Sequence, residues 1–198
     1  MNDIRPMAER LAIFFSEFYR RHRFDVEVPY PMGQNGNHLS DVYFGMKGEI
    51  KQALFYRPAT TEVSFVEMMD AMSGTQSWTE YHLELFDAAA WEPTKRGYWF
   101  WVDTGYKREL IKREEQISQE EAKTLMSLEE YIIFYYALMS SYPRLESPPH
   151  LIQLNSWLRT RITYNNHPHL ITARGGTTIG AMDKRPGYIR SSVRHPYI

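Results

Sequence analysis

The chain contains no cysteine among its 198 residues. Disulfide bonds, zinc sites built on thiolates and thiol nucleophiles are therefore excluded from its chemistry. Long hydrophobic runs are also missing, because the densest one, YIIFYYALM at residues 131–139, is about half of the length that spans a bilayer. The first residues do not resemble a secretory signal, since Glu9 and Arg10 precede only a short apolar run. We therefore expect a protein of the cytoplasm or of an assembled particle, with no membrane partner.

Net charge is small, but it is unevenly distributed along the chain. The whole sequence has a formal charge of −1. Residues 173–198 contain five Lys and Arg against one Asp, so this segment carries +4 and the remainder −5. Such asymmetry is typical of a segment that binds an acidic surface. That surface could be nucleic acid or the acidic body of another subunit, and we favour protein.

Hydrophobic residues make up 43% of the chain, which is enough to bury a core. Apolar side chains that recur every three or four positions predict an amphipathic helix over residues 4–22. Alternating apolar and polar residues predict strands, among them residues 24–30, 97–104 and 158–164. Glycine at Gly48 predicts a hairpin turn between residues 41–46 and the strand that follows.

Two capping boxes predict a helix, or a broken pair of helices, over about residues 119–141. Ser118 is followed by Glu121, and Ser127 is followed by Glu130. The second half of this region is apolar on all sides, so we expect it to be buried all round. The sum of these elements is an α+β fold: a small antiparallel sheet with flanking helices over residues 1–172.

Residues 173–198 are predicted to form an extended C-terminal arm. Four glycines and two prolines disfavour a helix or a central strand there. Ordering each residue costs about 1–2 kcal/mol of backbone entropy, whereas each apolar anchor returns about 1.5–3 kcal/mol if it is fully buried. We expect a neighbouring subunit to supply the pockets that balance this cost. Packing of the arm on its own body is the alternative.

The predicted partner-binding residues combine the tryptophans of one strand with the apolar and basic residues of the arm. Alternation places Trp99 and Trp101 on one face of strand 97–104, so an interface, burial by helices on both sides, or a base-stacking platform would each account for them. The complete set is Trp99, Trp101, Arg174, Ile179, Lys184, Arg185, Tyr188, Ile189, Arg190, Arg194, Tyr197 and Ile198.

No catalytic residue, metal site or cofactor is predicted. Asp41, Glu49 and Lys51 resemble a metal-dependent nuclease pattern, but a two-residue turn would place Asp41 roughly 16 Å from Glu49. Carboxylates that share a metal ion each bind it at about 2.0–2.6 Å. The other metal candidates are better explained as a solvated strand face and as loop histidines: Glu80, His82 and Glu84, and His167 with His169.

We therefore expect a non-enzymatic structural subunit of a multi-protein assembly, of the virion, phage-tail or secretion-machine type. In this interpretation the C-terminal arm binds the neighbouring subunits. The alternative is a small soluble protein that neutralises one partner, as immunity proteins do. A third possibility is a metal-dependent nuclease or a nucleic-acid-binding protein, whose affinity would fall steeply with salt.

Overall fold

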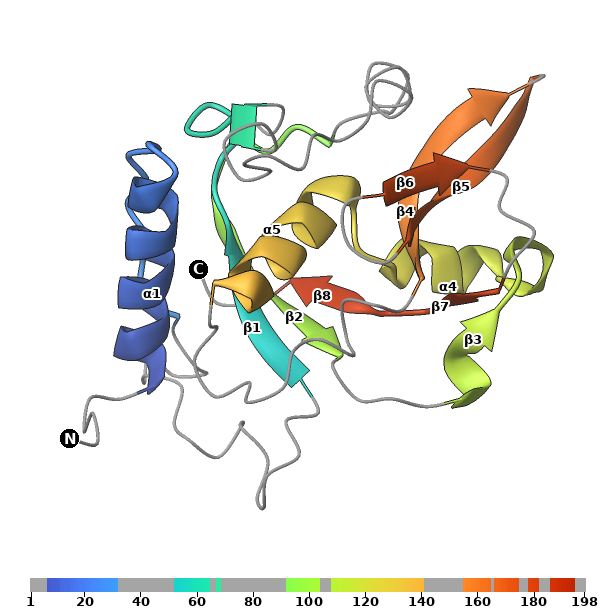
Figure 1. Ribbon diagram of the computed structural model, residues 1–198, viewed down its shortest axis with the longest axis horizontal. Coiled ribbons are helices and arrows are strands. Elements are labelled where there is room, and N and C mark those ends of the chain that lie inside the picture. Colours follow the sequence, from blue (N-terminus) through green and yellow to red (C-terminus); the bar gives the residue numbers. More distant parts are fainter. Residues whose placement is uncertain are drawn as a thin grey trace.

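The computed structural model describes residues 7–31, 52–64, 67–68, 92–103, 108–140, 155–164, 166–174, 178–181 and 186–194. It confirms the predicted α+β class, with helices and two sheets (Figure 1). The helices are α1 (Met7–Arg21), α4 (Gln119–Thr124) and α5 (Leu128–Met139). Two short 3₁₀ helices, η3 (Arg108–Leu110) and η4 (Glu114–Gln116), precede α4.

The first sheet has three antiparallel strands in the order β1-β2-β8. These strands are β1 (Gln52–Arg57), β2 (Tyr98–Asp103) and β8 (Ser192–Arg194). Helix α1 lies against one face and α5 against the other, as Figure 1 shows. The rings of Phe15 in α1 and Trp99 are 5.5 Å apart, and those of Phe55 and Phe134 in α5 are 5.4 Å apart. The main core is therefore layered as helix, sheet and helix.

The second sheet has five strands in the order β3-β7-β4-β5-β6. They are β3 (Ile111–Lys112), β4 (Ser156–Tyr164), β5 (His167–Arg174), β6 (Thr178–Ala181) and β7 (Gly187–Tyr188). Only β4 and β7 pair in parallel, and β4 has a register shift between Leu158 and Arg161. Helix α4 contacts β4 and helps to enclose a smaller core around Trp157.

Helix α1 follows from its apolar stripe and from the way it ends. Phe15 and Phe18 are buried, and basic residues occupy the last turn, where they interact favourably with the helix dipole. Arg23 has a left-handed φ of 68°, which ends the helix and reverses the chain. The Phe24 backbone N–H then donates to the Tyr19 carbonyl at 3.1 Å, so the following segment returns along the helix.

Helix α5 is capped as the sequence predicts. Ser127 Oγ accepts a hydrogen bond from the Glu130 backbone N–H at 3.2 Å, and Glu130 Oε2 accepts from the Ser127 N–H at 2.9 Å. The same arrangement at Ser118 begins α4. Most side chains of α5 are buried, because the helix lies between the first sheet and β4. The prediction of a broken helix pair with a buried second half is confirmed.

Residues 24–30 differ from the prediction of a paired strand. The segment is extended, but it belongs to no strand among the described residues. Phe24 and Val28 still pack on the core, and Val26 is buried. The alternation of apolar and polar residues therefore predicted correctly which side chains of residues 24–30 face inward. Pairing of this segment into a sheet also requires another strand beside it, which local sequence does not indicate. The predicted hairpin partner at residues 41–46 lies outside the described residues.

The described part of residues 173–198 is built into the sheets of its own chain. β6 pairs with β5, β7 lies between β3 and β4, and β8 pairs with β2. Strand β5 also runs across the predicted domain boundary at residue 172. The segment is extended, as predicted, but within the described residues it does not leave the body. The edges of β2, β4 and β5 supply backbone hydrogen bonds to these strands, so the chain's own body offsets part of the entropy cost of ordering them.

Within the described ranges, no helix combines the length and the apolar character needed to cross a membrane.

Candidate functional site

The two predicted tryptophans lie on one face of β2 and are buried to different extents. Trp99 is fully buried beneath α1, and its indole N–H donates to the Pro29 carbonyl at 3.0 Å. Trp101 is partly buried and packs against the main core. Helices α1 and α5 therefore account for the covering of the two faces of the sheet, while a contact of the partly buried Trp101 with a partner stays a prediction. Trp99 is therefore not available at the surface to a partner.

The arm residues that were expected to contact a partner are mostly buried in the chain itself. Ile179, Tyr188 and Ile189 each expose 4% of their surface or less. Arg190 is fully buried, where its Nη1 donates to the Asp103 carbonyl at 2.6 Å. This corrects the prediction for these four residues, because pairing of β6, β7 and β8 turns their side chains into the chain's own cores.

Arg194 is the predicted partner-binding residue that remains exposed among those whose side chains are described. Its guanidinium lies 4.0 Å from the centroid of the Tyr98 ring. Arg174 ends strand β5, and its side chain is not among the described features. Lys184, Arg185, Tyr197 and Ile198 lie outside the described residues, as do the nuclease-like residues Asp41, Glu49 and Lys51 and the strand face Glu80, His82 and Glu84.

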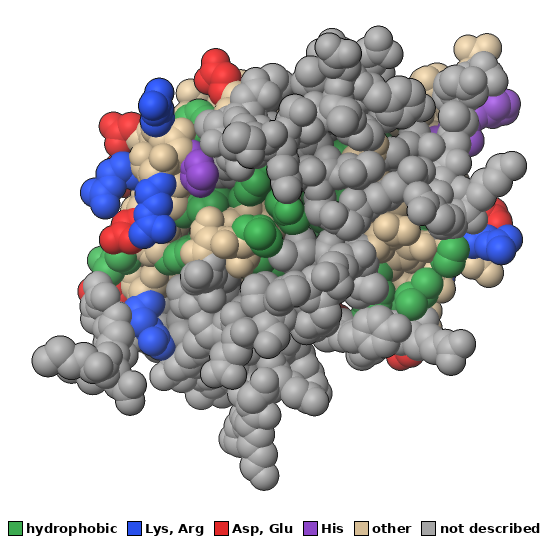
Figure 2. All heavy atoms as spheres, in the orientation of Figure 1, with side chains coloured by type: hydrophobic (Ala, Val, Ile, Leu, Met, Phe, Trp, Pro, Cys, Tyr) green, Lys and Arg blue, Asp and Glu red, His purple; other side chains and the backbone are tan. Residues whose placement is uncertain are grey.

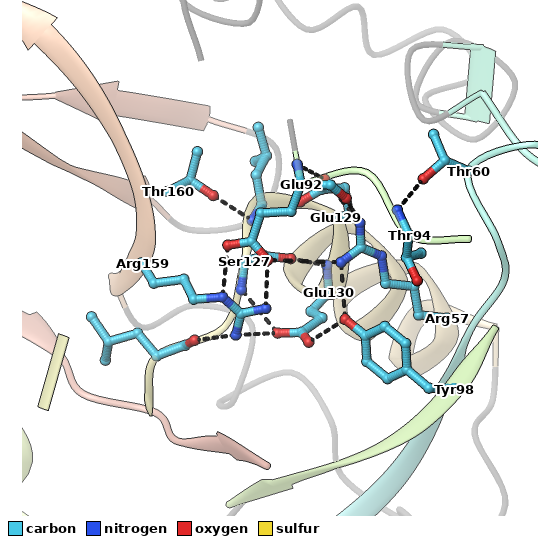
Figure 3. Close-up of polar contacts among 12 residues, drawn as sticks. Arg57, Thr60, Glu92, Thr94, Tyr98, Ser127, Glu129, Glu130, Arg159 and Thr160 are labelled. Atoms are coloured by element: carbon cyan, nitrogen blue, oxygen red, sulfur yellow. Dashed lines mark hydrogen bonds and ion pairs between the residues drawn. The ribbon is translucent and has the colours of Figure 1, made fainter. Parts of the chain in front are cut away.

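The first candidate site is a buried ionic network at the N-terminus of α5 (Figure 3). Arg57, at the end of β1, donates from Nη2 to Glu129 Oε1 at 3.0 Å and from Nη1 to the Tyr98 hydroxyl at 2.9 Å. The Tyr98 hydroxyl donates onward to Glu130 Oε1 at 2.8 Å. Arg57, Glu129 and Glu130 each expose 1% of their side chains or less. The network therefore lies inside the protein.

Arg159 in β4 joins the second sheet to this network. Its guanidinium holds Glu92 through two parallel hydrogen bonds of 2.8 and 2.9 Å. It also donates to Glu130 Oε2 at 2.9 Å and to the Leu125 carbonyl at 2.7 Å. All three nitrogens of the Arg159 guanidinium are thus engaged within the chain. The network connects both sheets, α5 and the segment before β2.

The charges of the network shift the pKa values of its members in opposite directions. Burial raises the pKa of Glu129 more than the Arg57 charge lowers it. Burial also acts on Glu92, but hydrogen bonds and charge from Arg159 outweigh it and lower the pKa of that carboxyl. Burial and the Glu130 charge raise the pKa of Tyr98 to about 12. Burial is thus the largest cause of the raised pKa values of Glu129 and Tyr98, whereas pairing with Arg159 sets the direction of the pKa shift of Glu92.

The chemistry of this network is that of a structural cross-link. Its carboxylates accept hydrogen bonds from arginines, Tyr98 and backbone N–H groups, and Leu128 N–H is capped by Thr160 Oγ1 at 2.9 Å. No group of three potential metal ligands occurs in the described part of the chain. Sequence reasoning found Glu130 as a capping residue only. Its arginine partner, Arg159, is 29 residues away, so no local pattern indicates it.

The second candidate site is a groove of about 460 Å³ between α1 and the returning segment 24–30, named here the α1 groove. Apolar side chains line it from both elements: Ala12, Ile13, Phe24, Val26, Val28 and Tyr30. Figure 2 shows acidic and basic side chains on the exposed surface of α1 at the left of the molecule. The lining therefore combines these apolar side chains with Ser16, Glu17, Arg20 and Asp25.

The backbone beside this groove is unusual for an extended segment. Residues 25–28 form no backbone hydrogen bond with any other described residue. Asp25 and Glu27 are exposed and form no ion pair within the described ranges. The α1 groove thus has apolar side chains and the Asp25 carboxylate in its lining, and Glu27 lies in the same segment. Among the described residues, the backbone of residues 25–28 has no hydrogen-bond partner and the two carboxylates have no counter-ion. These are features of a surface that binds an extended polypeptide.

Comparison with protein-family models, with curated proteins and with solved structures found no match for this chain.

Proposed function

We propose that the protein is a non-enzymatic structural subunit of a multi-protein assembly, and that it holds an extended segment of a neighbouring protein in the α1 groove. The binding surface differs from the arm expected from sequence, because the described anchors of that arm are buried in their own chain. The kind of assembly, whether virus particle, phage tail or secretion machine, stays a prediction from the sequence.

The observation that supports this proposal most strongly is that the backbone of residues 25–28 pairs with no described residue beside a groove with apolar side chains. An extended backbone with free donors and acceptors is a template for strand addition. Main-chain hydrogen bonds then provide affinity, and side-chain pockets provide specificity. Tyr30, which lines the groove and exposes 49% of its surface, suits such a role, since tyrosine is enriched at interfaces.

The exposed carboxylates Asp25 and Glu27 favour a second candidate, a small protein that neutralises one basic partner. Both candidate functions use the same groove, but they differ in the size of the complex that forms. A neutralising protein forms a 1:1 complex that does not grow, whereas an assembly subunit is incorporated into a larger particle. Native mass spectrometry of the complex separates them by its stoichiometry.

A photo-crosslinking residue in place of Tyr30 tests the proposed function in the cells that make the protein. We expect one discrete cross-linked protein, attached through an extended segment that fragment mass spectrometry locates. Met139, which exposes 59% of its surface on α5, is the control position and should not give this product.

A matched pair of substitutions completes this test. Ile13→Arg places a charge in the groove and should abolish the cross-link from position 30, whereas Met139→Arg should leave it unchanged. The proposal is refuted if a folded protein gives the same products from positions 30 and 139, or if Ile13→Arg leaves the product from position 30 intact.

A further inference from the structure

We infer that the segment bound in the α1 groove belongs to a partner protein and alternates apolar with basic residues, pairing through its main chain with residues 25–28. The inference rests on the proposed function and adds the chemistry of the partner to it. Three properties of the described residues support it: a backbone that pairs with no described residue, the alternation of side chains, and two carboxylates without a described counter-ion.

The backbone property dictates an extended partner. Residues 24–26 are consecutive and all line the groove, so their main chain forms part of its wall. In a strand, hydrogen-bonding groups point sideways while side chains point up and down. Because residues 25–28 form no backbone hydrogen bond with described residues, an added strand would supply hydrogen-bond partners that the described part of the chain does not.

The alternation of side chains in residues 24–28 indicates that apolar residues recur at every second position of the partner strand. Phe24 and Val28 pack on the core and Val26 is buried, whereas Asp25 and Glu27 are exposed. In paired strands, residues directly opposite each other have Cβ atoms about 4.5–5.5 Å apart, so they interact on the same face. A partner strand therefore presents apolar residues to the groove at every second position. The positions between them lie beside the two carboxylates.

The carboxylates dictate the sign of charge in the partner. Asp25 and Glu27 have no counter-ion within the described ranges. Asp25 lines the groove, and Glu27 lies two residues further along the same segment. Of the other charged residues in the lining, Glu17 is paired with Arg21 at 3.4 Å, and Arg20 is a cation. Opposite charges across a strand pair are stabilising, and like charges directly opposite are destabilising. Basic residues therefore fit beside Asp25 and Glu27, and acidic residues are disfavoured.

Fluorescence anisotropy with the full-length protein tests this inference with two synthetic probes. One is a labelled ten-residue peptide of alternating valine and lysine, and the other alternates valine and glutamate. We expect the lysine peptide to bind about tenfold more tightly, which corresponds to two favourable cross-strand charge pairs and the loss of two unfavourable ones. N-methylation of alternate residues along one edge of the lysine peptide should abolish its binding, because it removes main-chain donors.

Charge-reversal variants provide the matched control. Asp25→Lys combined with Glu27→Lys should reverse the preference, so that the glutamate peptide binds more tightly. Glu109→Lys combined with Glu115→Lys makes the same change in net charge at exposed positions away from the groove, and should leave the preference as it is.

The possible failures are distinguishable. If both peptides bind equally and Ile13→Arg weakens both, the basic partner is excluded while the proposed function stands. If neither peptide binds although position 30 cross-links in cells, the partner is not an alternating basic strand. If sedimentation shows self-association that Ile13→Arg abolishes, the groove takes a second copy of this chain and the inferred foreign partner is wrong.

Discussion

Arg57 and Arg190 are both fully buried, but their surroundings differ. Arg57 is bonded to Glu129, and its nitrogens contact Tyr98 and the Glu92 carbonyl. Arg190 has the Asp103 carbonyl and two aromatic rings, and its Nε and Nη2 have no hydrogen-bond partner among the described residues. Burial accordingly lowers the pKa of Arg190. The buried charge of Arg57 is therefore balanced by an ion pair with Glu129, whereas the buried charge of Arg190 has no ion pair with a described residue.

Substitution by methionine should separate these two arginines. Arg57→Met leaves Glu129 buried without its cation, so we expect the free energy of unfolding to fall by about 3–5 kcal/mol. Arg190→Met removes a desolvated charge that forms no ion pair with a described carboxylate, although the Asp103 charge acts on it, so stability should be maintained or raised. Urea unfolding followed by tryptophan fluorescence measures both. Equal losses in the two variants would contradict this assignment.

Helix α5 is the element whose start the sequence specifies most completely. Ser127 and Glu130 cap it as predicted, and the tertiary structure adds Thr160 as a third cap on the Leu128 N–H. Glu130 also binds Arg159, so the capping residue doubles as a member of the ionic network. Local pattern therefore identified the residue but not its second role, which depends on the position of β4.

The two capping serines provide a comparison of the same motif in buried and exposed settings. We expect Ser127→Ala to lower the free energy of unfolding by about 1–2 kcal/mol, since its box is buried. Ser118 caps the exposed, six-residue helix α4, so Ser118→Ala should lower the free energy of unfolding by only about 0.5 kcal/mol. Chemical denaturation of each variant gives the two values, and a larger loss at Ser118 would be inconsistent with the described burial.

At the scale of the whole molecule, the described tail residues are part of the fold. β7 lies so close to Trp157 that a Cβ on Gly187 would be 2.8 Å from the indole nitrogen. β8 completes the first sheet through Val193, which pairs with Trp101. The balance between backbone entropy and apolar anchors in residues 173–198 considers each residue by itself. It leaves out the sheet edges that bind these residues, and the number of such edges is a property of the whole folded molecule.

A chain ending at Thr172 should therefore lose its cooperative structure. Truncation removes β6, β7 and β8 and exposes the surfaces that they cover in both sheets. We expect the near-ultraviolet circular dichroism signal and the thermal unfolding transition to be lost, while the full-length chain keeps both. A truncated protein with an unchanged melting temperature would restore the interpretation of residues 173–198 as a separate arm.

The sequence by itself determined the α+β class, the ends of α5, the burial of that helix and the inward face of residues 24–30. These features depend on local periodicity and capping, which neighbouring residues control. Only the tertiary structure decided that Phe100 pairs with Arg194, that Arg159 reaches Glu92, and that residues 25–28 stay unpaired among the described residues. Such contacts join residues far apart in the chain, and their energies depend on which edges and charges the completed fold brings together.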